Sequence, residues 1–150
     1  MPNIVLATFG SLGDLHPKIA LGIELKRRGH DVTIAAMQYY REKIGMIGLG
    51  FAPMRPNLDP DDRELVREMM DANTGTERIL GDIILADLGP MYEDLTTAVA
   101  GADMVISGEI VCAVKSVVEK TNIKWVSTSL APISFMSAYP KLSRLLKPFK

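Results

Sequence analysis

The chain has 150 residues, of which 47% are hydrophobic, and this is enough apolar material for one domain with a sizeable core. Its net charge of −1 excludes the basic surface that is typical of nucleic-acid-binding proteins. A single cysteine, Cys112, excludes an internal disulfide and predicts a reducing, cytoplasmic setting. No apolar run is long enough to span a membrane, the first strand leaves no room for a signal peptide, and no cluster of metal ligands is present.

Strands and helices are predicted to alternate along the chain. Short apolar runs predict strands at residues 3–8, 31–36, 51–54, 103–107 and 124–129. Helical composition and end signals predict helices at about residues 16–28, 39–47 and 110–120, the last of them ending at Asn122. Because strands that alternate with helices form parallel sheets covered on both faces, we expect an α/β, Rossmann-like fold.

Two further helices are predicted between the third and fourth strands. Asp59 is a candidate N-cap, and the helix after it has an apolar face made by Leu65, Val66, Met69 and Met70. Thr74 and Glu77 match a capping box that opens a long helix ending at Gly101. Pro90 is expected to kink or divide this helix, because proline removes a backbone donor.

Residues 9–17, which read Phe-Gly-Ser-Leu-Gly-Asp-Leu-His-Pro, form the turn between the first strand and the first helix. Gly10 and Gly13 permit a sharp turn and a close approach to a ligand. Ser11, Asp14 and His16 are its side chains suited to acid–base or hydrogen-bonding chemistry. Open α/β sheets bind ligands at the carboxyl ends of their strands, where this turn lies. Asp14 is therefore suited to meeting a substrate, to capping the helix as its N-cap, or to both.

The turn lacks the sequence motifs that bind nucleotide cofactors, so such cofactors are disfavoured. The dinucleotide fingerprint needs a third glycine and an acid after the second strand, but residues 35–38 read Ala-Ala-Met-Gln. No Gly-Lys-Ser/Thr follows that would cradle a phosphate. An NAD(P)-type oxidoreductase is therefore a weak alternative, and we expect no cofactor.

Four segments in order carry a resemblance to a known family. Residues 10–17 read Gly-Ser-Leu-Gly-Asp-Leu-His-Pro, residues 20–25 Ala-Leu-Gly-Ile-Glu-Leu, residues 28–33 Arg-Gly-His-Asp-Val-Thr, and residues 125–135 Trp-Val-Ser-Thr-Ser-Leu-Ala-Pro-Ile-Ser-Phe. They resemble the amino-terminal domain of glycosyltransferases with two Rossmann-like domains (the GT-B architecture), in family 28 and its antibiotic-aglycone and sterol glucosyltransferases. The resemblance implies that residues 1–150 are the acceptor-binding half, and that the C-terminal nucleotide-sugar-binding domain is absent from this chain.

The same resemblance implies a metal-independent, inverting transfer of a sugar from a nucleoside-diphosphate sugar to a hydroxyl of an apolar small molecule or lipid. It assigns the general base to Asp14 by position, whereas His16 is open as a second base, a binding residue or a helix cap. Glu109 stands where relatives carry an orienting Asp, and it is either that partner or a cap of the next helix. The other substrate-binding residues it implies are Gly10, Ser11, Leu12, Gly13, Pro132, Phe135 and Met136.

Some interpretations stay open at this point. In the family, the segment with Met69 and Met70 overlies the acceptor cleft, although a methionine pair also suits a core. The basic stretch from Lys141 has three possible roles, which are an interdomain linker, a peripheral membrane contact and a solvated helix. Of these we favour the linker. Without the donor domain, the chain alone is expected to be inactive. The alternative function is a stand-alone Rossmann-like ligand-binding module without catalysis.

Overall fold

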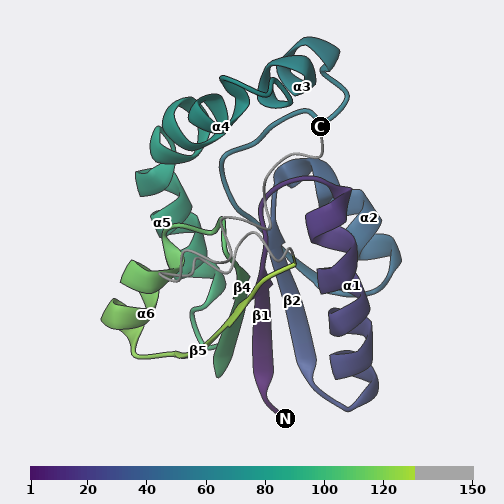
Figure 1. Ribbon diagram of the computed structural model, residues 1–150. Coiled ribbons are helices and arrows are strands. Elements are labelled where there is room, and N and C mark those ends of the chain that lie inside the picture. Colours follow the sequence, from purple (N-terminus) through teal and green to yellow (C-terminus); the bar gives the residue numbers. More distant parts are fainter. Residues whose placement is uncertain (131–150) are drawn as a thin grey trace, which may run out of the picture.

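A computed structural model describes residues 1–130, which form a five-stranded parallel sheet with helices on both faces (Figure 1). The strands are β1 (Asn3–Ala7), β2 (Asp31–Ala36), β3 (Gly50–Pro53), β4 (Met104–Gly108) and β5 (Lys124–Thr128). Their order across the sheet is β3-β2-β1-β4-β5, and every neighbouring pair is parallel. The predicted α/β, Rossmann-like fold is therefore confirmed, whereas Pro132, Phe135 and Met136 lie outside the described residues.

The order of the strands decides which helix covers which face. The chain moves outward from β1 to β3, then returns across the sheet to β4, and right-handed crossovers place the helices of these two halves on opposite faces. Accordingly, α1 (Leu12–Arg27), η1 (Gln38–Tyr40) and α2 (Arg41–Met46) lie on one side, and α5 (Leu88–Ala98) and α6 (Val114–Thr121) on the other (Figure 1). The return segment, with α3 (Arg63–Met69), α4 (Gly75–Glu77) and η2 (Arg78–Leu85), lies beyond the carboxyl ends of the strands (Figure 1).

The core lies around β1, the middle strand of the described sheet, and its two neighbours β2 and β4. In β1, every residue from Ile4 to Ala7 is buried, whichever face its side chain is on, as expected for a parallel strand covered on both faces. The fully buried side chains that fill the two interfaces between sheet and helices include Leu6, Leu15, Ile34, Ile44, Met91, Leu95, Val105 and Val117.

Helix α1 begins four residues before the predicted start, because its N-cap is Ser11 and not Asp14. Ser11 Oγ accepts a hydrogen bond from Gly13 N at 3.1 Å, and Ser11 N donates to Asp14 Oδ2 at 2.9 Å. This reciprocal pair is a capping box with Asp14 at the third helical position. Of the alternatives left open for these residues, Asp14 as the N-cap and His16 as a helix cap are therefore excluded.

Two capping predictions in the return segment were also wrong. Helix α3 is capped by Asp62, not Asp59, because Asp62 Oδ1 accepts from the backbone N–H groups of the next turn. Thr74 is the N-cap residue of α4, as the predicted helix start requires, but its side chain makes no capping bond; instead, Asp71 Oδ1 accepts from Thr74 N at 2.9 Å. The cap of α3 is therefore three residues later than predicted, and at α4 the aspartate bond to Thr74 takes the place of the expected capping bond.

The prediction that Pro90 divides the long helix is confirmed. η2 ends at Leu85 and α5 begins at Leu88, with Pro90 in its first turn, where a missing backbone N–H is tolerated. The predicted helix over residues 110–120 starts only at Val114, because the residues before it form turns. It ends at Asn122 as predicted, in the left-handed conformation with φ of 57°.

Candidate active site

The carboxyl ends of β1, β4 and β5 converge on one small cavity, as their position in the sheet predicts. The cavity has a volume of about 10 Å³, and the polar side chains that line it are Thr8, Asp14, Lys18 and Glu109. Thr8 directly follows β1, Glu109 directly follows β4, and Leu130 comes shortly after β5. The structure thus brings together Asp14 and Glu109, which are 95 residues apart in the sequence.

The Asp14 carboxylate is held by the turn that precedes α1. Its Oδ2 accepts from Ser11 N at 2.9 Å and from Ser11 Oγ at 3.2 Å. Gly10 has a φ of +124°, and a Cβ on it would lie only 2.4 Å from Asp14 Oδ2. Glycine is therefore required here both for the backbone conformation and for the room that the carboxylate occupies.

Tyr40, from η1, approaches the same turn. Its hydroxyl donates to the carbonyl oxygen of Gly10 at 3.1 Å. Burial, and to a smaller degree the charge of Asp14, raise the pKa of the Tyr40 hydroxyl above its ordinary value. Tyr40 is therefore a neutral donor that fixes the backbone beside Asp14.

Three other predicted residues lie less centrally. His16 is exposed, and two residues along a helix place it about 200° around the axis from Asp14, so the two side chains diverge. Leu12 is 42% exposed in the first turn of α1. Glu109 lines the cavity but is exposed, and of its two alternative roles the helix cap is excluded, because the N-cap of α6 is Ala113.

Sequence reasoning missed Lys18, which is only 2% exposed. Its Nζ donates to Thr128 Oγ1 at the end of β5, and Thr128 Oγ1 donates to the Ser107 carbonyl oxygen at 2.8 Å. Burial lowers the pKa of the Lys18 ammonium, against the opposing charges of Glu109 and Asp14. A signal was available, because the buried stripe of α1 consists of Leu15, Lys18, Ile19 and Gly22, in which Lys18 is the charged member.

An apolar hollow of about 140 Å³ lies against the other side of the same turn. Gly10 and Ser11 line it together with Met37 and residues of the return segment, which are Leu58, Asp59, Pro60, Leu65, Val66, Met69 and Met70. The apolar face that was predicted for this helix therefore borders the turn that carries Asp14. Flexible thioethers suit such a surface to apolar ligands of varied shape.

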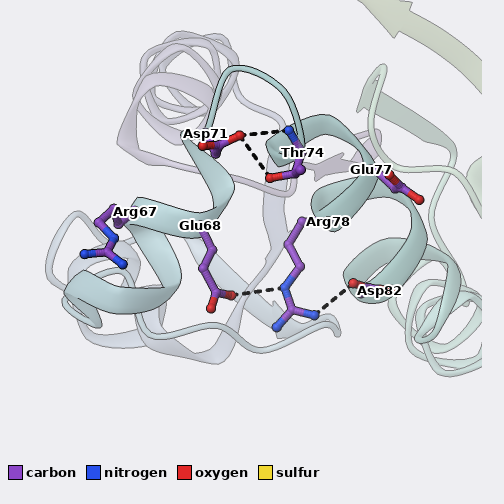
Figure 2. Close-up of a pocket in the computed structure, with 7 residues that line it drawn as sticks. All are labelled: Arg67, Glu68, Asp71, Thr74, Glu77, Arg78 and Asp82. Carbon is purple, nitrogen blue, oxygen red and sulfur yellow. Dashed lines mark hydrogen bonds and ion pairs between the residues drawn. The ribbon is translucent and has the colours of Figure 1, made fainter.

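A larger hollow of about 730 Å³, between α3 and the segment of α4 and η2, is polar and has a different character (Figure 2). Figure 2 shows Arg78 between two acids, donating to Glu68 Oε2 at 3.2 Å and to Asp82 Oδ2 at 2.9 Å. At the edge of the same hollow, Asp71 Oδ1 accepts hydrogen bonds from the backbone N–H and the hydroxyl of Thr74 (Figure 2). Arg78, Glu68, Asp82 and Asp71 are thus engaged with one another or with Thr74, whereas the smaller hollow is lined mainly by apolar side chains.

The described part of the chain has neither a cluster of metal ligands nor a membrane-spanning helix. Residues 1–130 contain no group of three or more His, Cys, Asp or Glu side chains that could hold a metal ion. Within the same residues, no helix is both long enough and apolar enough to cross a bilayer.

Residues 4–123 match the model of the glycosyltransferase family 28 N-terminal domain. The chain belongs to this family. The sterol 3-beta-glucosyltransferase of Candida albicans is 31% identical to it over 141 residues, which cover 92% of this chain and 9% of that protein. An uncharacterized glycosyltransferase of Mycobacterium tuberculosis is 28% identical over 118 residues, which cover 72% of this chain and 27% of that protein.

Solved glycosyltransferases share the fold of this family 28 domain. The calicheamicin glycosyltransferase CalG4 superposes with a TM-score of 0.68 at 17% identity, over 97% of this chain and 37% of that chain. A glycosyltransferase from Streptomyces sp. SF2575 gives a TM-score of 0.65 at 20% identity, over 86% of this chain and 39% of that chain. The predicted GT-B resemblance is confirmed, and the chain spans less than two fifths of the length of each of these proteins.

Proposed function

We propose that this family 28 domain is the acceptor-binding half of an inverting glycosyltransferase, whose nucleotide-sugar site belongs to a second domain. The enzyme moves a sugar from a nucleoside-diphosphate sugar to a hydroxyl of an apolar small molecule or lipid. The observation that carries the proposal is the apolar hollow of about 140 Å³ against the turn that fixes Asp14. The sterol glucosyltransferase relative, and a solved neighbour complexed with thymidine diphosphate, support the two substrate classes.

Asp14 acts as the general base in this proposal. The acceptor hydroxyl gives its proton to the Asp14 carboxylate as its oxygen attacks the anomeric carbon of the sugar. The bond from that carbon to the diphosphate oxygen breaks on the opposite side, and the diphosphate leaves with the electron pair. A single displacement of this kind inverts the anomeric centre. A positioned base contributes on the order of 10²–10⁴ in rate, and the bonds from Ser11 fix its orientation.

The experiment is to measure nucleoside-diphosphate release by the full-length protein with UDP- and dTDP-sugars and mixed apolar acceptors, in the wild type and in Asp14→Asn. The amide oxygen of Asn still accepts the Ser11 N–H bond, so the turn is preserved while the base is lost. We expect acceptor-dependent release to fall at least about 100-fold. The matched control is Asp31→Asn, an exposed aspartate at the amino end of β2, which leaves the rate unchanged.

Each other result selects a different interpretation. Undiminished release in Asp14→Asn moves the base elsewhere, and His16→Gln is then the next variant to assay. A full-length protein that turns over no donor but binds apolar ligands is the binding module without catalysis. Tight binding of NAD(P) to the chain would restore the oxidoreductase alternative. The proposed roles of Pro132, Phe135, Met136 and the basic stretch from Lys141 are to be tested by substitution, because they lie outside the described residues.

A further inference from the structure

Lys18 is buried at the point where three elements of the candidate site meet. It lies on α1 one helical turn beyond Asp14 and lines the same cavity as Asp14 and Glu109. Only 2% of its surface is exposed. Taking an ammonium out of water is unfavourable unless charged or polar partners compensate, so a lysine here needs a reason beyond filling space. A methionine of similar length would fill the same space without that cost.

The hydrogen bonds of Lys18 connect α1 to the far side of the site. Its Nζ donates to Thr128 Oγ1, a residue 110 positions later, and Thr128 Oγ1 donates to Ser107 O at 2.8 Å. Ser107 Oγ in turn accepts from Trp125 Nε1 at 2.9 Å. The carboxyl ends of β4 and β5 are therefore tied to the helix that carries Asp14, and the tie passes through one ammonium group.

The charges around this ammonium come from separate elements. Asp14 faces it from α1, and Glu109 faces it from the turn after β4. Tyr40 approaches Asp14 from η1 as a neutral hydroxyl. Of the described residues that line the cavity, Lys18 is the one cation. Without it, two carboxylates would border one small space with no positive charge among the described residues that line it, and they would repel each other.

We propose that Lys18 is a positioning residue for glycosyl transfer, whose ammonium holds the Asp14 and Glu109 carboxylates and the end of β5 around one cavity. The inference rests on the proposed function, because it assigns Lys18 to the same reaction. Lys18 acts through Asp14 and through β5 and does not itself exchange a proton with the acceptor. Its presence therefore favours activity at the expense of stability.

The stability effect has a definite sign. Burial lowers the pKa of Lys18 in the folded chain below its ordinary 10.5, so the unfolded chain binds more protons between the two values. The free energy of unfolding of the wild type therefore rises with pH between these two pKa values. The destabilising effect of Lys18 is fully present at neutral pH. Lys18→Met is expected to be more stable than the wild type at pH 7, and the gap narrows as the pH approaches 10.5.

The first arm of the test is urea unfolding of the 150-residue chain at several pH values. Lys18→Met is compared with Lys26→Met, an exposed lysine on the same helix, which is not expected to raise the midpoint. If the urea midpoint of Lys18→Met at pH 7 is higher than that of the wild type, the buried Lys18 charge costs stability, which supports a role for it in function. A lower midpoint, together with an unchanged transfer rate, makes Lys18 a structural tie and overturns the proposal.

The second arm is sugar transfer by the full-length protein. Lys18→Met should lower kcat/KM at least about tenfold, and Lys18→Arg should restore most of it. Because a guanidinium stays protonated, Lys18→Arg should also move the alkaline limb of the pH–rate profile to higher pH, which a merely structural role would not do. An alkaline limb that stays in place overturns the proposal.

Two further results keep this inference separate from the proposed function. If Lys18→Arg does not fold, Thr128→Val removes the acceptor of the ammonium, and its effect should not add to that of Lys18→Met. Full additivity of the two variants overturns the proposal. If Asp14→Asn is inactive while Lys18→Met is normal, only the positioning role fails. If the full-length protein transfers no sugar, the proposed function fails and the positioning role fails with it.

Discussion

Replacing Gly10 by alanine should displace the Asp14 carboxylate without touching Asp14 itself. The new Cβ would lie 2.4 Å from Asp14 Oδ2 and 3.0 Å from its Cγ, so the carboxylate must move. Moving it breaks the two hydrogen bonds that Oδ2 accepts from Ser11. The φ of +124° at residue 10 also lies in a region that residues other than glycine avoid.

The magnitude follows from these two effects. The backbone strain is about 1–3 kcal/mol, and loss of the capping interaction adds about 1 kcal/mol. We therefore expect Gly10→Ala to lower the free energy of unfolding by about 2–4 kcal/mol. Gly101→Ala is the matched control, because Gly101 also has a positive φ, of +78°, but an added Cβ would meet no atom within 4 Å. That variant should lose only about 1–2 kcal/mol.

Urea unfolding of the chain measures both values, and acceptor-dependent nucleoside-diphosphate release by the full-length protein measures the effect on the site. Gly10→Ala should reduce the transfer rate as well as stability, whereas Gly101→Ala should reduce only stability. Equal losses of stability in the two variants would refute the contact between residue 10 and the carboxylate. A normal transfer rate in a folded Gly10→Ala protein would refute the need to hold Asp14 in this place.

Two other predictions concern the supports of the site. Arg55 donates to both oxygens of Asp94, at 2.7 and 2.8 Å, and its hydrogen bond lowers the pKa of that carboxyl. Asp94→Asn should therefore reduce the free energy of unfolding by about 1–3 kcal/mol at pH 7. The difference should vanish as the pH falls through the lowered pKa, below 3.8, and a constant difference in urea unfolding contradicts the pairing. Met69→Gln in the apolar hollow should raise the KM for an apolar acceptor several-fold and leave kcat unchanged. Met46→Gln, at an exposed side chain, is the control and should leave both constants unchanged. Equal KM values for Met69→Gln and the wild type would contradict the acceptor site.

The fold was predictable because its signals are local and repeated. Each strand is a short apolar run between turn residues, and the alternation with helices leaves the parallel sheet as the consistent solution. The meeting of Asp14 with Glu109 was also predictable, because the carboxyl ends of neighbouring parallel strands share one edge. Both inferences need only the order of the elements and not the conformation of any side chain.

The details that were missed depend on contacts between distant residues or on competition between neighbouring caps. Ser11, Asp14, Asp59 and Asp62 are all acceptable caps by residue type, and the backbone path selects among them. Lys18 was missed because its partner, Thr128, is 110 residues away, and a lysine is ordinarily exposed. The sequence shows the apolar stripe of α1, but no residue near Lys18 in the sequence explains why a lysine lies within it.

The middle position of β1 in the described sheet has a consequence for synthesis. β1 pairs with β2 soon after both are made, whereas its other neighbour, β4, follows much later; the bond from Asn3 N to Asp103 Oδ2 spans 100 residues. At about 5–20 residues per second, the nascent chain holds a half-sheet with an unpaired edge for several seconds. An open edge is a template for pairing with other chains. In the interval between the emergence of β3 and that of β4, the edge of β1 that later pairs with β4 is therefore open to pairing with other chains.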